Sequence, residues 1–105
     1  MRFLKLAMVL GFSSGIALAF AADHTIHQKG RKFSVTDLSV KKGDTLVFVN
    51  DDNIAHNVLS TTAGNEFNLR SQPPGTSTPV TFDVAGQFKV ICAIHPAMRM
   101  TVTVE

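Results

Sequence analysis

Three side chains with an affinity for soft metal ions lie close together near the end of the chain. They are Cys92, His95 and Met98, in the segment Cys-Ala-Ile-His-Pro-Ala-Met. A fourth candidate, His56, lies far upstream and follows the turn-rich segment Asn50–Asn53. One thiolate, two imidazoles and a weak thioether form a donor set that proteins use to bind copper. These residue types at this spacing predict a copper site, with His56, Cys92 and His95 as strong ligands and Met98 as the axial ligand.

Other metals fit this donor set less well. Zinc usually takes four strong nitrogen, sulfur or oxygen donors and rarely a thioether. Iron–sulfur clusters need more cysteines than the single Cys92 of this chain. Each residue also has a simpler interpretation, because Cys92 could be a small buried apolar residue and the histidines could be solvated loop residues. The combined spacing favours the metal-ligand interpretation.

Met100 is the alternative to Met98 as the axial ligand. The two methionines have the same strand parity, so alternation along a strand does not separate them. Met98 lies at the predicted start of the last strand and Met100 is an early residue of that strand, so both stay open as axial ligands at this point.

The elements that must position these residues are β-strands. Residues typical of strands recur between turn signals such as Lys42-Gly43-Asp44 and Ala85-Gly86. A double proline, Pro73-Pro74, cannot lie in a central strand and predicts a long connection. Seven or eight short strands at this spacing predict an all-β fold, either a β-sandwich or a small barrel, and the long connection is one that a Greek key requires. The strands are expected near His24–Gln28, Thr36–Val40, Thr45–Val49, Asn57–Ser60, Glu66–Leu69, Thr78–Val84, Gln87–Cys92 and Arg99–Val104. The predicted core residues are Phe33, Val47, Phe48, Phe82, Phe88 and Val90.

The first 21 residues have the pattern of a secretory signal peptide. Arg2 and Lys5 precede an apolar run that ends in Ala19-Phe20-Ala21, a small-x-small cleavage site. An uncleaved membrane anchor is the alternative interpretation. Cleavage leaves one domain over residues 22–105, with no membrane segment and with eight basic residues against eight acidic ones. Without a basic run, nucleic acid is not an expected partner.

Three motifs in the predicted domain resemble those of the small blue-copper proteins, the cupredoxins. They are Gly43-Asp44-Thr45-x-x-Phe48-x-Asn50, His56-Asn57-Val58 and Cys92-x-x-His95-Pro96-x-Met98. The short last loop is most similar to that of amicyanin and related plastocyanin-like proteins. Counted from Met98 to the alternating Val102 and Val104, the resemblance aligns Met98 with the ligand Met of these relatives and favours it over Met100.

The resemblance implies an all-β Greek-key β-sandwich and a periplasmic type-1 copper protein that carries single electrons between redox partners. An enzyme is not expected, because no Gly-rich oxyanion loop or second metal-ligand cluster accompanies Cys92 in the sequence.

The partners are expected to be transient and the protein monomeric. Pro96 and Ala97 would form an apolar rim beside the exposed edge of His95, where a redox partner could dock.

Two residues depart from the pattern of many cupredoxins. Ala93 stands where many relatives carry Ser or Thr, and Ile94 stands where they carry Pro. Ala93 has no hydroxyl to tie the ligand loop to Asn57. Ile94 keeps a backbone N–H, which predicts a second hydrogen bond to the sulfur of Cys92. Asn57, next to a ligand, is predicted to brace the two loops by hydrogen bonds.

Two further hypotheses concern copper handling. The same site could serve copper delivery, storage or resistance, which His24, His27 and Met100 slightly favour. If cleavage follows Ala21, the terminus Ala22-Asp23-His24 could chelate Cu(II) in a square plane through an amine, two amides and an imidazole. A frayed terminus leading into the first strand is the simpler alternative.

Overall fold

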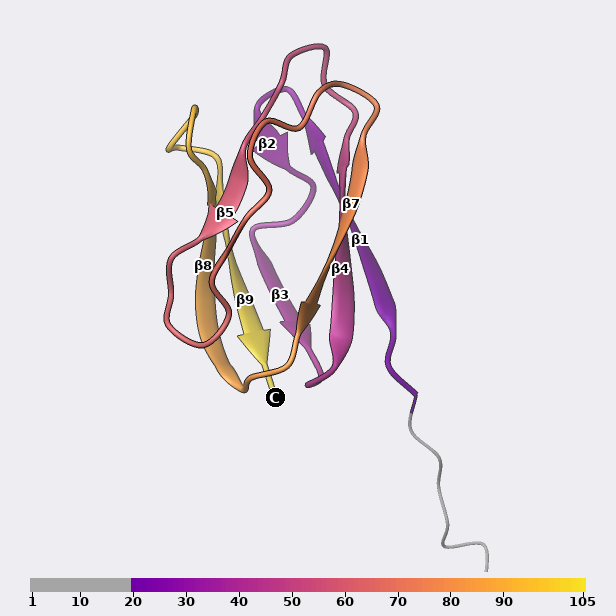
Figure 1. Cartoon of the computed structure of the whole chain (residues 1–105), viewed down its shortest axis with the longest axis vertical. Helices are drawn as coiled ribbons and strands as arrows, with labels where there is room; N and C mark the ends of the chain where they lie inside the picture. The colour runs from indigo at the N-terminus through magenta and orange to yellow at the C-terminus, as the bar shows by residue number, and fades with distance from the viewer. Residues whose placement is uncertain (1–19) are drawn as a thin grey trace, which may run out of the picture.

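The computed structural model describes residues 20–105, which form two β-sheets packed face to face (Figure 1). The four-stranded sheet has the order β2-β1-β4-β7, and the five-stranded sheet has the order β3-β9-β8-β5-β6. The strands are β1 (Asp23–Lys29), β2 (Lys32–Phe33), β3 (Asp37–Val40), β4 (Asp44–Asn50), β5 (Val58–Ser60), β6 (Phe67–Asn68), β7 (Ser77–Phe82), β8 (Gly86–Cys92) and β9 (Arg99–Val104). The predicted all-β sandwich is confirmed.

The predicted signal peptide falls almost wholly outside the described residues. No helix within residues 20–105 is long and apolar enough to cross a bilayer.

The chain crosses between the sheets several times, so strands distant in sequence become neighbours. Strand β1 pairs in parallel with β4, and β3 pairs in parallel with β9, whereas β8 pairs antiparallel with both β5 and β9. Parallel neighbours require a crossover rather than a hairpin. These crossovers gather the β4–β5, β6–β7 and β8–β9 connections at one end of the sandwich, the upper end in Figure 1.

The core lies between the sheets and is built by strict alternation. In β4, Leu46 and Phe48 are fully buried, while Val47 lies on the outer face and is only partly buried. The prediction of Val47 as a core residue was therefore wrong, because an apolar run in a strand still sends alternate side chains to opposite faces. Phe82 and Phe88 pack edge to face with their ring centroids 6.1 Å apart, an arrangement that aromatic rings favour.

The prolines occupy positions that strands permit. Pro73 and Pro74 lie in the connection between β6 and β7, as predicted. Pro79 lies within β7, but β7 is at the edge of its sheet. An edge strand tolerates a missing N–H because one side has no neighbour to bond.

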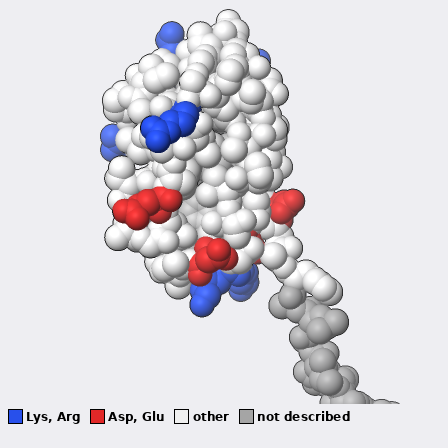
Figure 2. Space-filling model, viewed as in Figure 1, with Lys and Arg blue, Asp and Glu red and all other residues white. Residues whose placement is uncertain are grey.

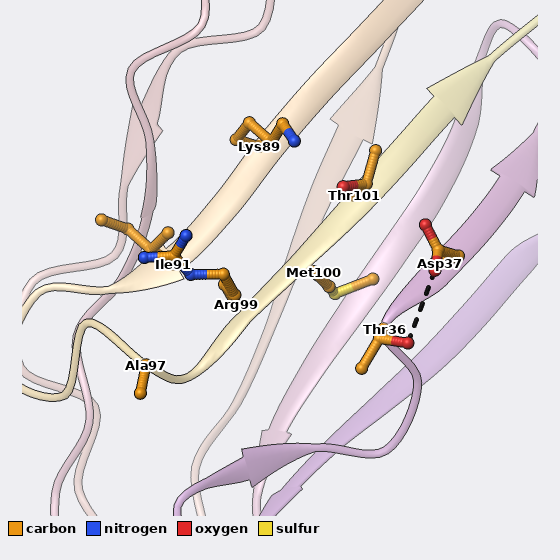
Figure 3. A pocket seen from close by; sticks show the side chains of 8 residues that line it. All are labelled: Thr36, Asp37, Lys89, Ile91, Ala97, Arg99, Met100 and Thr101. Carbon is orange, nitrogen blue, oxygen red and sulfur yellow. Dashed lines mark hydrogen bonds between the residues drawn. The ribbon is translucent and has the colours of Figure 1, made fainter.

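The outer face of the five-stranded sheet carries a groove of about 460 Å³ beside β3, β8 and β9 (Figure 3). Lys89, Ile91, Arg99 and Thr101 line it from β8 and β9. Charge is unevenly distributed over the face drawn in Figure 2, where the upper part shows Lys and Arg but no Asp or Glu.

Candidate metal centre

Two connections at the upper end of the sandwich supply the predicted ligands. His56 lies between β4 and β5, and Cys92 is the last residue of β8. Strands β5 and β8 pair antiparallel with Val58 opposite Cys92, so His56 is brought next to the sulfur by sheet register. His95 and Met98 follow in the β8–β9 loop, where Cys92 N–H donates to Met98 O (3.0 Å) and Met98 N–H donates to His95 O (2.8 Å).

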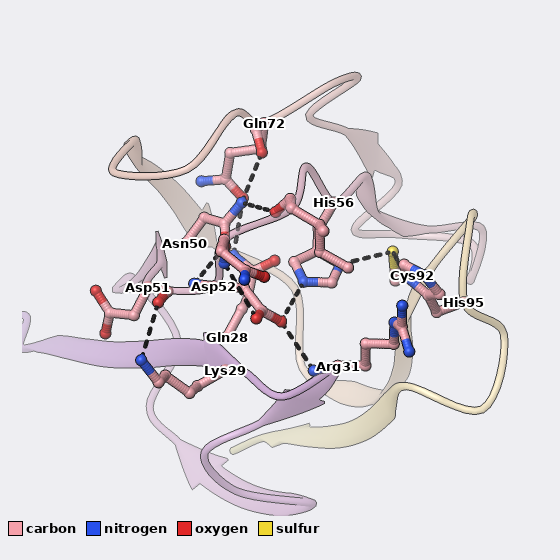
Figure 4. A network of polar contacts seen from close by, with 12 residues as sticks. Gln28, Lys29, Arg31, Asn50, Asp51, Asp52, His56, Gln72, Cys92 and His95 are labelled. Atoms are coloured by element: carbon pink, nitrogen blue, oxygen red, sulfur yellow. Dashed lines mark hydrogen bonds and ion pairs between the residues drawn. The ribbon is translucent and has the colours of Figure 1, made fainter.

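The three strong donors converge on one point (Figure 4). Ligand atoms of His56, Cys92 and His95 all lie within 4.8 Å of one another. The Sγ atom of Cys92 is 3.6 Å from Nδ1 of His56 and 3.9 Å from Nδ1 of His95. His56 and Cys92 are fully buried, and His95 is partly exposed. A shielded cysteine sulfur flanked by two ring nitrogens matches the strong donors of a copper site, so these residues fit a copper ion.

A carboxylate that the sequence analysis did not identify orients the first histidine. Nε2 of His56 lies 3.0 Å from Oδ2 of Asp52. A hydrogen on Nε2 leaves Nδ1, the nitrogen that faces the sulfur, free to bind a metal. The only signal in the sequence was a carboxylate four residues before the histidine, and it lay in a segment whose Asn and Asp residues already suggested a turn.

Asp52 is itself held in place by the turn between β1 and β2. The backbone N–H of Arg31 donates to Oδ2 of Asp52 at 2.8 Å. Gly30 and Arg31 both have positive φ, 61° and 58°, as a two-residue type I′ turn requires. The Arg31 N–H and, next, the His56 ring hold the pKa of Asp52 well below its usual range. Asp52 therefore stays ionised at neutral pH and keeps accepting from His56.

Buried amide side chains fix the backbone around His56. His56 and Gln72 exchange two backbone hydrogen bonds, 3.1 and 2.7 Å long. The side-chain amide of Asn50 donates to the carbonyls of Ile54 and Gln72, and Gln28 donates to the side chain of Gln72. Buried polar networks of this kind make a loop rigid, although within residues 20–105 Oε1 of Gln28 has no hydrogen-bond partner.

The sulfur of Cys92 accepts a hydrogen bond from the backbone of Asn57. Asn57 N–H lies 3.3 Å from Sγ, and Asn57 O accepts from Ala93 N–H at 2.9 Å. Asn57 does brace the two loops, but through its backbone, because its side chain bonds Asn68 instead. The second donor predicted at the backbone N–H of Ile94 is not found: within the described residues, no hydrogen bond joins Ile94 to the sulfur.

The two methionines lie in different surroundings. Met98 is bonded through its backbone to both Cys92 and His95, within the loop that carries the ligands. Met100 is opposite Val90 in the β8–β9 pair and lines the groove on the β3 side of β9. Both residues are only 2% exposed, so burial alone does not separate them. The backbone placement favours Met98 as the axial ligand, and this assignment stays a prediction.

The other two histidines lie away from the metal centre. His24 bonds Asp44 at 2.9 Å, and His27 bonds Asp51 on the surface. Ala22 N also bonds Asp44, and Asp23 pairs with Thr45 in the sheet. A square-planar Cu(II) complex at this terminus would have to break these contacts, so the structure favours the alternative in which the terminus leads into the first strand.

A Greek-key sandwich with one thiolate and two imidazoles gathered at one end defines a cupredoxin. Residues 20–105 match the family described as copper binding proteins, plastocyanin/azurin family, and the chain belongs to this family. Its cofactor is one copper ion.

Several known proteins are similar to this chain in sequence or in structure. The methylamine utilization protein MauL of Methylorubrum extorquens is 36% identical over 104 residues, which cover 95% of this chain and 89% of that protein. Amicyanin of Paracoccus versutus is 29% identical over 77 residues, which cover 70% of this chain and 58% of amicyanin. The solved structure of a purple cupredoxin from Nitrosopumilus maritimus has a TM-score of 0.71 at 26% identity, covering 79% of this chain and all of the other.

Proposed function

We propose that this cupredoxin carries single electrons between redox proteins of the periplasm, with copper held by His56, Cys92, His95 and Met98. The observation that carries the proposal is the convergence of a buried thiol and two Nδ1 atoms at one end of the sandwich. Copper bound there supplies a one-electron couple between Cu(II) and Cu(I).

The residues of the chain have three tasks in such a carrier. The buried side chains of His56 and Cys92 exclude water from the donor atoms. Asp52 and Gln72 fix the His56 segment, so that its ligand nitrogen keeps one position. The partly exposed ring of His95 connects the centre to the surface, which gives an electron a short path to a docked partner.

An apolar rim surrounds the exposed edge of His95. Ile94, Pro96 and Ala97 are all exposed in the β8–β9 loop. A small apolar contact of this kind suits a transient redox encounter, which buries little area. We infer a monomer that binds its partners briefly at this rim.

The test is the visible spectrum of the protein purified with Cu(II). A thiolate bound to copper in a three-ligand site gives an intense band near ~600 nm with narrow copper hyperfine splitting. The Cys92→Ser variant should lose this band. A colourless protein that binds zinc equally well would refute the proposal, as would a blue protein that cannot be reduced and reoxidised repeatedly.

Copper delivery or storage by the same site is the competing function. The residues that favoured copper delivery from sequence have other contacts: His24 and His27 bond aspartates, and Met100 is buried. An electron carrier should retain copper through many redox cycles in the presence of a Cu(I) chelator. Rapid loss of the metal to the chelator would favour delivery.

We also propose that Cys92 is a ligand and not an enzyme nucleophile. Its side chain is fully buried, and a metal-bound thiolate resists alkylation. Iodoacetamide should therefore leave Cys92 unmodified in the copper-loaded protein, and rapid labelling would favour a nucleophile.

Export with cleavage after Ala21 completes the proposal. Ala22 N lies 2.9 Å from Oδ1 of Asp44, so cleavage would convert this amide contact into an ion pair with a new α-ammonium group. Mass spectrometry of the exported protein should find Ala22 as its first residue. A chain that keeps residues 1–21 would contradict export by cleavage.

A further inference from the structure

A groove lined by cationic residues lies directly beside the proposed copper loop. It has a volume of about 330 Å³ and runs between the β1–β2 turn, β2 and the start of β9. Three of its lining residues are basic and none is acidic. The cationic groove is lined by Arg31, Lys32, Phe33, Thr36, Ala97, Met98 and Arg99.

The basic groups of the cationic groove have no carboxylate partners of their own. Within residues 20–105, every ion pair joins a histidine to an aspartate, so Arg31, Lys32 and Arg99 take part in none. Nε and Nη2 of Arg99 donate to the carbonyl of Pro96 at 3.2 and 3.1 Å. This contact holds the Arg99 guanidinium at the edge of the β8–β9 loop.

More positive charge continues beyond the cationic groove. Thr36, Ala97 and Arg99 also line the neighbouring groove, where Lys89 adds a fourth basic group and Asp37 is the one acidic residue (Figure 3). On the face of the molecule drawn in Figure 2, the upper part shows Lys and Arg side chains and no Asp or Glu.

Asp51 and Asp52 are acidic residues of the β4–β5 connection at the same end, but each forms its ion pair with a histidine rather than with a basic side chain of the groove. The cationic groove therefore keeps its positive charge, although the predicted mature domain has equal numbers of basic and acidic residues.

The cationic groove is continuous with the apolar rim around His95. Ala97 belongs to both, and Met98 forms part of the groove wall. A partner that placed carboxylates in the groove would therefore rest its apolar contact on Ile94, Pro96 and Ala97, beside the His95 ring. Complementary charge of this kind guides encounter and fixes the orientation of a short-lived complex.

We propose that the cationic groove binds an acidic loop of a redox partner protein and thereby orients the partner over His95. This inference rests on the proposed electron-carrier function and adds the chemistry of the partner. The occupant is a polypeptide with several Asp or Glu side chains flanking an apolar residue, because the groove combines three cations with an apolar wall.

The test uses the copper-loaded protein in the Cu(I) state and a synthetic peptide, Glu-Glu-Phe-Glu-Glu, followed by ¹⁵N NMR. The peptide should shift the amides of Arg31, Lys32 and the β8–β9 loop, and added salt should weaken its binding. The peptide Lys-Lys-Phe-Lys-Lys should shift none of them. Inorganic phosphate is titrated separately, and phosphate binding as tight as peptide binding would identify a free-anion site and overturn the proposal.

Charge reversal supplies the matched variants. Arg31→Glu and Lys32→Glu should each weaken peptide binding about fivefold, because an attraction is replaced by a repulsion. Lys41→Glu and Lys42→Glu, in the β3–β4 turn at the other end of the sandwich, should leave binding within about twofold. Arg99 is a poorer test residue because its side chain also contacts the ligand loop.

The outcomes separate this inference from the proposed function. The acidic-partner inference would be overturned if the acidic peptide did not bind. It would also be overturned if Lys41→Glu and Lys42→Glu weakened peptide binding as much as Arg31→Glu and Lys32→Glu. The visible spectrum and reversible reduction of the same samples report on the electron-carrier function independently, because they involve no partner.

Discussion

At the scale of single residues, the ligands could be predicted because their chemistry is rare. A cysteine, a histidine and a methionine within one short loop seldom occur together except where they bind a metal, and the structure brings Cys92, His95 and His56 together. The residues that orient them could not be predicted in the same way. Asp52 is a common turn residue, and Asn57 acts through backbone atoms that every residue carries. Only the fold shows where these groups point.

The Asp52–His56 contact predicts a specific loss of metal affinity. In Asp52→Ala, the His56 ring loses the acceptor for Nε2–H, so Cu(I) affinity should fall by about 10- to 100-fold. Asp52→Asn should retain more affinity, because its amide oxygen still accepts. Competition with a Cu(I) chelator measures both variants.

Asp51→Asn is the matched control for Asp52. Asp51 is the adjacent residue, but it is exposed and bonds the surface residue His27. Its substitution should leave copper affinity unchanged. If Asp52→Ala bound copper as tightly as the parent protein, Asp52 would have no part in orienting His56.

The axial ligand is tested by a pair of identical substitutions. Met98→Gln should shift both the visible spectrum and the reduction potential, because the axial donor tunes such a site. Met100→Gln introduces the same side-chain amide at a buried position within β9. It should therefore lower the stability of the fold while changing the reduction potential little. Visible spectroscopy and voltammetry on both variants measure these changes. A larger change of spectrum and potential in Met100→Gln than in Met98→Gln would assign the axial role to Met100.

At the scale of elements, all the strands expected from sequence are present within a few residues of their predicted positions. The exceptions have physical causes. Strand β2, which was not predicted, has only two residues, too few for a pattern of alternation. Strand β6 was predicted over Glu66–Leu69 and is two residues shorter than expected. The parallel pairs β1–β4 and β3–β9 depend on crossovers between distant segments, and local sequence carries no signal for them.

Asp44 shows how one side chain can join several elements. At the start of β4, it accepts from Ala22 N–H before β1, from Lys41 N–H after β3 and from the ring of His24 in β1. Hydrogen bonds, first from Ala22 and then from His24 and Lys41, lower the pKa of Asp44 from 3.8 to about 2. The ionised carboxylate is therefore favoured more strongly in the folded protein than in the unfolded chain.

This lowered pKa predicts a contribution to stability that depends on pH. A carboxylate whose pKa falls on folding stabilises the protein above its unfolded pKa, and the contribution is lost as pH falls through the folded pKa. Asp44→Asn should therefore lower the melting temperature at pH 7, and its difference from the parent protein should shrink between about pH 4 and pH 2. Asp83→Asn, exposed in the β7–β8 turn, is the control. A constant difference across this range would contradict the assignment.

At the scale of the whole molecule, the metal centre links the two sheets of the sandwich. His56 lies where the chain passes from β4 in one sheet to β5 in the other, and Cys92 ends β8 in the second sheet. The unfolded chain separates these donors, so copper binds the folded form in preference. Ligand binding then adds directly to the stability of the fold.

The size of this effect follows from mass action. At a free Cu(I) concentration about 1,000 times the dissociation constant, binding stabilises the folded state by about 4 kcal/mol. For a domain of this length, that corresponds to a rise in melting temperature of about 15–30 °C. Anaerobic thermal unfolding with and without Cu(I) measures the rise. Cys92→Ser keeps the buried volume but loses the thiolate, so its melting temperature should respond far less to Cu(I). If Cu(I) stabilised the parent protein and Cys92→Ser equally, the metal would be binding elsewhere. The site formed by His56, Cys92 and His95 would then not be the copper site.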